Sequence, residues 1–235
     1  MKILISGGDS KFSKELQKQN QDHRLIPLNS QEMNVLHPKD IENAIKTFKP
    51  DVFLHSAALS RPMDVHKKYP EKSITTNIIG TANCVLACIK YNIKFVYIST
   101  DFVYEGITGN YKETDPVKPI NEYAWSKLGG ECSVMLYPNS LILRTAMVEK
   151  PFPHEKAFTD IYKSSIWYSD AAKKTLELIE KKAVGVYNLG GERKSIFNFV
   201  KQEKNNILPL LKEQVKEITH TDISLNIDKL NDTTI

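Results

Sequence analysis

The chain has 235 residues, of which 41% are hydrophobic and 26% charged, the usual balance of a globular protein in water. A chain of this length can bury one large core and add a small second lobe. Its net charge of +4 is small and spread along the chain, so composition gives no reason to expect nucleic acid as a partner. No apolar run approaches the ~20 residues of a membrane span, and the N-terminal MKILISGG predicts a strand entering a turn rather than a signal peptide.

The three cysteines, Cys84, Cys88 and Cys132, lie in stretches that we predict to be helical. Cys84 and Cys88 share one helix face, and no histidine or cysteine follows at zinc-ligand spacing, so no metal site is expected. We expect buried free thiols in a protein of the reducing cytoplasm.

Short apolar runs alternate with amphipathic stretches through the first 145 residues. This alternation predicts an α/β fold, a doubly wound parallel sheet with helices on both faces. Beyond it we expect a helix over 169–182, a strand over 184–189, a helix starting over 195–200, and a tail from Gln202 that folds as a helix over the substrate side. The earlier strands are predicted over 2–6, 24–28, 52–55, 95–99 and 140–144, and the helices over 12–19, 39–48, 71–91 and from Tyr123.

The first predicted strand ends in two glycines and is followed by a helix, an arrangement that suits a dinucleotide phosphate. The glycines allow a tight turn, and the helix N-terminus offers free N–H groups to a pyrophosphate. A full GxxGxxG motif would need glycine where the chain has Ser10 and Ser13, and each serine narrows the approach to the backbone. The turn by itself fits an ordinary strand–helix connection equally well. The candidate pyrophosphate residues are Gly7, Asp9, Ser10, Lys11 and Phe12.

The ends of the next two strands carry polar and small residues. The second strand ends at Asn29, with neither the acidic residue that suits NAD nor the basic residue that suits the phosphate of NADP, so the choice of cofactor stays open. Ser56, Ala57 and Ala58 follow the third strand, where small side chains would let a flat ligand lie against the backbone. His55, just before them, is more typical of a core histidine than of a catalyst.

The stretch from residue 95 to residue 131 holds the candidate catalytic groups. Tyr123 and Lys127 are four residues apart at the start of a predicted helix, so their side chains share one face. A phenol beside an ammonium forms an acid pair, because the positive charge lowers the tyrosine pKa. Thr100, at the end of a predicted strand, would supply a hydroxyl to the same place, since ligands bind at the strand ends of open parallel sheets.

A set of motifs in chain order resembles the extended short-chain dehydrogenase/reductase family. Within that family the chain is most similar to dTDP-4-dehydrorhamnose reductases. The YxxxK pattern alone is common by chance, but STDFVYEG followed by YAWSKLGGE at this distance is specific, and the resemblance covers nearly the whole chain. The motifs are the Gly7 turn, SAA after the third strand, Asn77, STDFVYEG, YAWSKLGGE, LILRT, SSIWYSDAAKKTLELIE, GVYNLGG and SLNIDKL.

The resemblance implies an oxidoreductase with an NAD(P)-binding Rossmann fold that reduces a nucleotide-linked 4-keto sugar for polysaccharide precursors such as dTDP-rhamnose. It makes Tyr123 the acid that protonates the keto oxygen as hydride arrives from NADPH or NADH. It makes Lys127 the holder of the nicotinamide ribose and Thr100 the hydroxyl that orients the carbonyl. For Asn77 it implies a helix-kinking support of Lys127, against the equal alternative of a surface amide. The implied cofactor contacts are Gly7, Asp9, Ser10, Lys11, Phe12, Asn29, Ser56, Ala57, Ala58, Asn77, Ser99 and Lys127.

Two regions follow: a dinucleotide-binding domain over 1–145 and a mixed region over 146–235, in which 168–190 returns to the sheet and the rest forms a small substrate lobe. The link from Arg144 to Tyr168 is too short for the turn and helix that such reductases carry there. An epimerase of the same family is an alternative. So is a non-catalytic NAD(P)-binding subunit like the regulatory subunit of methionine adenosyltransferase. We expect a nucleotide-sugar substrate and no nucleic acid or membrane partner; a homodimer is compatible with the resemblance.

Overall fold

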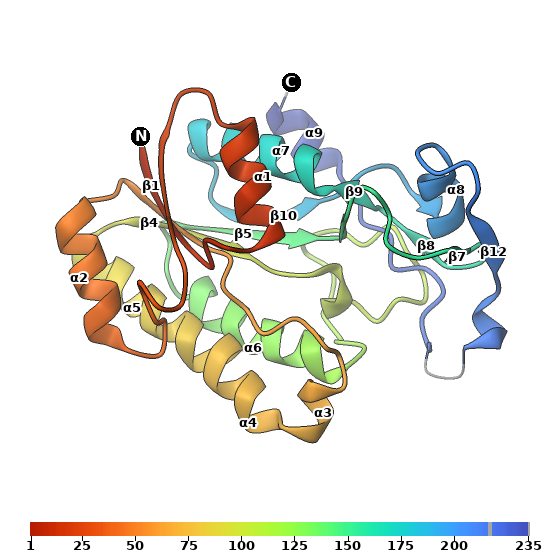
Figure 1. The fold of residues 1–235 in the computed structure, drawn as a ribbon, viewed down its shortest axis with the longest axis horizontal. Helices are drawn as coiled ribbons and strands as arrows, with labels where there is room; N and C mark the ends of the chain where they lie inside the picture. Colours follow the sequence, from red (N-terminus) through yellow and green to blue (C-terminus); the bar gives the residue numbers. More distant parts are fainter. Residues whose placement is uncertain (216–217, 235) are drawn as a thin grey trace.

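The computed structural model describes residues 1–215 and 218–234, and its centre is a six-stranded sheet with helices on both faces (Figure 1). Every pairing within this sheet is parallel, which confirms the predicted doubly wound α/β fold. The strands lie in the order β10-β5-β4-β3-β1-β2. Because the chain passes from β1 to β2 on one side and then to β3 on the other, the strand order reverses between β1 and β3. The strands are β1 (Lys2–Ser6), β2 (Arg24–Leu28), β3 (Val52–His55), β4 (Lys94–Ile98), β5 (Ser140–Thr145) and β10 (Gly185–Leu189).

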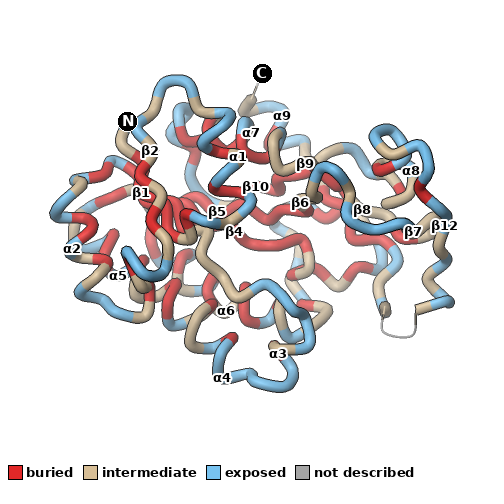
Figure 2. The backbone as a smooth tube through the Cα atoms, viewed as in Figure 1, coloured by how far each residue is buried: buried red, intermediate tan, exposed pale blue. Residues whose placement is uncertain are grey.

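Helices α1 (Lys11–Gln19), α7 (Tyr168–Glu180) and α9 (Asp228–Thr234) cover one face of the sheet (Figure 1). The other face carries α2 (Pro38–Phe48), α5 (Gly80–Tyr91) and α6 (Glu122–Met135). Each face has its own hydrophobic core, and the strands between them are buried on both sides (Figure 2). Burial on both faces explains why the strands read as unbroken apolar runs in the sequence.

The predicted helix over 71–91 is helical throughout but changes its winding in the middle. It comprises α4 (Pro70–Ser73), a π-helical turn η1 (Ile74–Ile79) and α5. Asn77 lies in this π turn and is fully buried, so the alternative of a surface amide is wrong. Wider π turns inside α-helices are frequent at functional sites.

A small lobe of short strands lies to the right of the sheet in Figure 1. The predicted tail helix after Gln202 is wrong: Leu208–Leu210 forms strand β12, parallel to β7 (Lys156–Phe158). Pro209 explains the difference, because proline in a helix interior removes a hydrogen bond and clashes with the preceding turn. Residues 216–217 and 235 of that tail lie outside the described part. The other short elements are α3 (Val65–Lys68), η2 (Asp101–Val103), β6 (Met147–Val148), β8 (Tyr162–Lys163), β9 (Ile166–Trp167), β11 (Lys194–Ser195), α8 (Ile196–Lys201) and η3 (Lys212–Gln214).

The cysteine prediction is right for two residues and wrong for the third. Cys84 and Cys88 are buried free thiols, whereas Cys132 is exposed on the outer side of α6. In the described residues no helix is both long and apolar enough to cross a bilayer.

Glycine at position 130 lets α6 approach the π turn closely. A Cβ atom built on Gly130 would lie 2.5 Å from the carbonyl oxygen of Asn77 and 2.7 Å from the hydroxyl of Tyr97. Neither atom can move easily, because both belong to buried residues. This close approach holds the helix that carries Tyr123 and Lys127 against the rest of the fold.

We therefore expect Gly130→Ala to lower the free energy of unfolding by about 2 kcal/mol, the usual cost of overpacking a filled core. Urea unfolding monitored by circular dichroism measures the change. Cys132→Ala, on the exposed side of the same helix, should change the value by less than about 0.5 kcal/mol. Equal stability of Gly130→Ala and the unmodified protein would show that the contact is not tight.

Candidate active site

The turn after β1 lies where the strand order of the sheet reverses, the usual binding place in open parallel sheets. Gly7 has a left-handed backbone with φ of 72°, and a Cβ on it would lie 2.8 Å from the backbone of Ala57. A Cβ on Gly8 would likewise lie 2.8 Å from the backbone of Leu28. Both glycines are therefore needed for the strand ends to meet this closely.

The two serines at the motif positions have different structural roles. Ser10 is the N-cap of α1, since its hydroxyl accepts the backbone N–H of Ser13 at 3.1 Å. Ser10 also lies 3.4 Å from the hydroxyl of Ser56, after β3. The hydroxyl of Ser13 is fully buried and has no hydrogen-bond partner among the described residues. The hydroxyl of Ser10 thus occupies one N–H group at the helix start, that of Ser13, and its side chain covers the start of the helix.

Asn77 connects the loop after β3 to helix α6. Its amide group exchanges two hydrogen bonds with the backbone of Leu59, at 2.8 and 2.9 Å, and donates to the hydroxyl of Ser126 at 2.8 Å. Ser126 in turn donates to the backbone carbonyl of Tyr123 at 2.7 Å. The π turn, the loop and the first turn of α6 are therefore held together by one buried amide.

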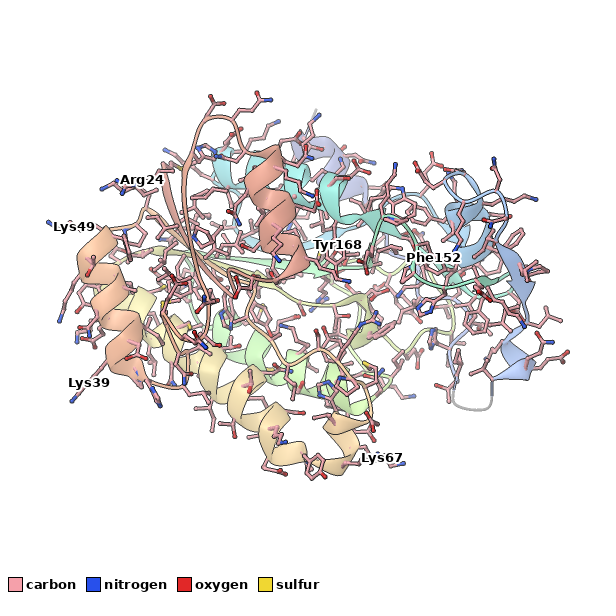
Figure 3. The ribbon with its side chains drawn as sticks, viewed as in Figure 1. Arg24, Lys39, Lys49, Lys67, Phe152 and Tyr168 are labelled. Atoms are coloured by element: carbon pink, nitrogen blue, oxygen red, sulfur yellow. The ribbon has the colours of Figure 1, made fainter. Side chains whose placement is uncertain are left out.

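Tyr123 is half-buried between groups from several elements. Its ring packs against that of His66, with 5.2 Å between the ring centroids. Burial raises the pKa of Tyr123, the carboxylate of Asp101 and the phenol of Tyr168 raise it further, and Arg61 opposes them. Figure 3 shows Tyr168 at the start of α7, above the loops at the end of the sheet.

This direction corrects one expectation from the sequence. The prediction was that the ammonium of Lys127 draws the pKa of Tyr123 toward neutrality, but burial and Asp101 raise that pKa instead. The ammonium of Lys127 lies over the ring of Tyr97, 4.1 Å from its centroid. Burial lowers the pKa of Lys127 to about 7, with Glu131 opposing the change. At neutral pH the phenol is therefore protonated, and the buried lysine is able to release a proton.

A buried ion pair lies behind Lys127 on the same helix. Both Nη2 and Nε of Arg144 donate to Oε1 of Glu131, at 2.6 and 3.1 Å, and Ser99 donates to Oε2 at 2.7 Å. Arg144 also donates to the hydroxyl of Tyr104, which donates to Asn188 at 3.1 Å. The pair thus joins α6 to the ends of β4, β5 and β10.

A second buried pair lies beside the threonine. Nζ of Lys163, on β8, lies 2.8 Å from Oδ2 of Asp101 and 4.1 Å above the ring centre of Phe102. Oγ1 of Thr100 accepts the N–H of Phe102 and donates to Oδ1 of Asp101, both at 3.3 Å. Thr100 therefore caps η2 and shares a carboxylate with a lysine from the small lobe.

The remaining predicted cofactor residues differ in whether their side chains are already bonded or buried within the protein. Ser99 is bound to Glu131, and the side chain of Phe12 lies in the core, which leaves only its backbone at the helix start. The side chain of Asn29 accepts two backbone N–H groups of the turn that follows β2. Lys11 is ion-paired with Glu149, and Asp9 is exposed. The described residues hold no cluster of three His, Cys, Asp or Glu side chains that would suit a metal.

His55 lies in the core, and four residues near the catalytic candidates were not predicted from the sequence. His55 is a core residue as predicted, with hydrogen bonds to Ser6 at 2.7 Å and Thr81 at 3.0 Å. Sequence reasoning missed the neighbours that come from distant segments. Tyr168 lies within the SSIWYSDAAKKTLELIE motif, Lys163 directly precedes that motif, and Arg61 closely follows the SAA motif, but no motif indicated what these side chains contact. The missed residues are Arg61, His66, Lys163 and Tyr168.

The low pKa of Lys127 predicts how stability depends on pH. Between about pH 7 and 10.5 the unfolded chain holds a proton that the native Lys127 lacks, so the contribution of Lys127 to stability rises with pH in that window. The thiols of Cys84 and Cys88 oppose this rise near and above pH 9, because burial raises the pKa of both. Between pH 7 and pH 8 we therefore expect the free energy of unfolding to rise by about 1.4 kcal/mol per unit at most, and this rise to vanish in Lys127→Met. Urea unfolding over that pH range measures both slopes.

Lys90→Met is the matched control, because Lys90 is exposed and its only recorded ion-pair partner in the described chain is Glu42. It should keep the slope of the unmodified protein. A slope that persists in Lys127→Met would mean that another group titrates.

Comparison with known proteins gives matches along the chain. Residues 1–160 match the family model described as the RmlD substrate binding domain. A dTDP-4-dehydrorhamnose reductase of Aggregatibacter actinomycetemcomitans is 30% identical over 150 residues, which are 62% of this chain and 51% of that protein. A methionine adenosyltransferase 2 subunit beta of Danio rerio is 34% identical over 116 residues, 49% of this chain and 35% of that protein. The chain thus spans about half the length of that reductase, and less of the subunit.

Comparison of the fold with solved structures also finds a dTDP-4-dehydrorhamnose reductase. The crystal structure of a dTDP-4-dehydrorhamnose reductase of Bacillus anthracis in complex with NADP has a TM-score of 0.87. The two chains are 22% identical, and the match covers 98% of this chain and 92% of that one. Since the family model covers more than half of the chain, the protein belongs to the RmlD substrate-binding-domain family.

Proposed function

We propose that the protein is an NAD(P)H-dependent reductase that acts on a nucleotide-linked 4-keto sugar, in the synthesis of polysaccharide precursors such as dTDP-rhamnose. The observation that carries the proposal is the meeting of three groups at one end of the sheet. The glycine turn lies beside Ala57, and the hydroxyl of Thr100 lies beside Asp101. The carboxylate of Asp101 is close enough to Tyr123 to raise the pKa of its phenol. The similar reductases of Aggregatibacter actinomycetemcomitans and Bacillus anthracis support the same activity.

The glycine turn fits a dinucleotide. Gly7 allows the turn to lie against the backbone of Ala57, and α1 begins without an acidic residue in its first turn. Negative charge is favoured at such a helix start. Its backbone would hold the pyrophosphate, with Lys127 at the nicotinamide ribose. When bound, the nicotinamide supplies the hydride; the protein supplies position and charge.

Each catalytic group has one task in this proposal. Tyr123 donates its phenolic proton to the keto oxygen, and its raised pKa keeps that proton in place until negative charge develops. Lys127, whose pKa lies near 7, returns a proton to the phenolate. Thr100 donates a hydrogen bond to the keto oxygen and orients it. The region over 1–145 holds the cofactor, and the short elements after Thr145 form the substrate side.

A second candidate is a non-catalytic subunit that binds NAD(P). The matches to methionine adenosyltransferase 2 subunit beta favour it, as does the capping side chain of Ser10 at the helix start. The two candidates differ in whether Tyr123 matters for turnover and in whether any turnover occurs.

Tyr123→Phe tests the catalytic assignment. The change keeps the ring against His66 and removes the proton donor, so we expect turnover to fall by about 10²–10⁴ with little change in melting temperature. The assay follows single-turnover oxidation of NADPH or NADH with a panel of nucleotide-linked 4-keto sugars. Tyr69→Phe, at an exposed tyrosine, should turn over normally. Normal turnover of Tyr123→Phe would refute the mechanism, and no turnover by the unmodified protein would favour the subunit.

Ser10→Gly tests the pyrophosphate site. Glycine costs an N-cap only a few tenths of a kcal/mol and opens the approach to the backbone, so we expect NADPH and NADH to bind more tightly. Calorimetry with each cofactor measures the affinity. Ser195→Gly is the matched control, because Ser195 caps α8 in the same way. An unchanged affinity in Ser10→Gly would place the pyrophosphate elsewhere.

A further inference from the structure

We propose that Lys163 is a positioning residue for the reduction: its ammonium neutralises Asp101, so that Thr100 can turn its hydroxyl proton from Asp101 to the keto oxygen of the substrate. This rests on the proposed function, in which Thr100 and Tyr123 bind the keto oxygen. It adds a residue from the small lobe that the catalytic motifs do not contain.

The first step is the hydrogen-bond direction at Thr100. A hydroxyl has one proton, and Thr100 gives that proton to Oδ1 of Asp101 while it accepts the N–H of Phe102. A keto oxygen is only an acceptor, so Thr100 must leave Asp101 before it can donate to the substrate. The distance of 3.3 Å makes its bond to Asp101 a weak one that can be exchanged.

The second step is the state of the carboxylate after that exchange. The side chain of Asp101 is 3% exposed, and a buried carboxylate that loses its donors is costly. Lys163 remains at 2.8 Å from Oδ2, and its own side chain is 14% exposed, so the charge of Asp101 stays paired when Thr100 turns away. The ring of Phe102 lies under the same ammonium and holds it in place.

The third step is the effect of the Asp101 charge on Tyr123 and on the bound keto oxygen. Negative charge develops on the keto oxygen during reduction, and an unpaired carboxylate nearby would oppose it. Burial raises the pKa of Asp101 and Lys163 is the main group that lowers it, while Asp101 itself raises the pKa of Tyr123. Among the described residues, the other titratable or charged groups recorded near this pair are His220, which packs on Phe102 and lies near Lys212, and Arg61, His66 and Tyr168 around Tyr123.

Lys163→Met gives the distinguishing pH profile. With Asp101 ionised and unpaired, we expect turnover near pH 8 to fall by about tenfold or more, with a smaller change in KM. As the pH falls, Asp101 becomes protonated and neutral, so turnover of the variant should rise, whereas the unmodified protein should show no such rise. Lys163→Arg keeps the charge and should restore the normal profile. Lys18→Met, which removes an exposed lysine paired with Glu15, is the control.

A double-mutant cycle keeps the test decisive if Lys163→Met folds poorly. In the background of Asp101→Asn the carboxylate is gone, so adding Lys163→Met should change turnover by no more than about twofold. A tenfold loss in that background, or a loss in Lys163→Met that is equal at every pH, would show that Lys163 is merely structural and would overturn the proposal.

A measurement without substrate separates this proposal from the proposed function. Carbon-13 NMR of the free protein follows the carboxyl of Asp101 and the phenol of Tyr123, with Asp101→Asn and Tyr123→Phe for assignment. We expect both titration midpoints to move to higher pH in Lys163→Met. Unchanged midpoints would refute the pairing whether or not the protein reduces a sugar, whereas normal turnover of Tyr123→Phe would refute the reductase mechanism alone.

Discussion

The buried pair of Arg144 and Glu131 is the interaction on which the carboxyl end of the sheet depends. Removing water from two charges is costly, and the cost is offset only where geometry is good and the remaining polar atoms are satisfied. Here the guanidinium makes two bonds to one carboxylate oxygen, and Ser99 binds the other. Tyr104 and Asn188 complete the network. Loss of either charge would leave the other buried without its partner.

That network also explains where the reactive groups can lie. Glu131 is one turn after Lys127 on α6, so the pair fixes the helix against β4 and β5 at the height of the lysine. On a neighbouring side of α6, Gly130 allows contact with the π turn, and Asn77 holds the loop after β3. The helix is therefore held between two buried polar contacts, and its first turn presents Tyr123 to the strand ends.

The turn after β1 shows how a motif can be changed without loss of the local fold. Gly7 and Gly8 are required by backbone contacts of 2.8 Å, and both are present. Position 10 has no such constraint on its backbone, so serine is accepted there and caps α1 with its hydroxyl. The side chain at position 10 also limits how closely a ligand can approach the backbone of the turn. Serine there is therefore compatible with the fold but would weaken the binding of a ligand.

The sequence alone determined the elements whose causes are local. Apolar runs ending in glycine or small residues predicted the parallel strands, and the spacing of Tyr123 and Lys127 placed them on one helix face. Pro209 is a local signal against a tail helix, because a helix interior disfavours proline. Tertiary structure decided what depends on contacts between distant segments: the burial that raises the pKa of Tyr123, the position of the Lys127 ammonium over Tyr97, and the pairing of Asp101 with Lys163. Residue spacing carries no information on these contacts, because desolvation and long-range pairing arise only once the small lobe and the loops have packed on the sheet.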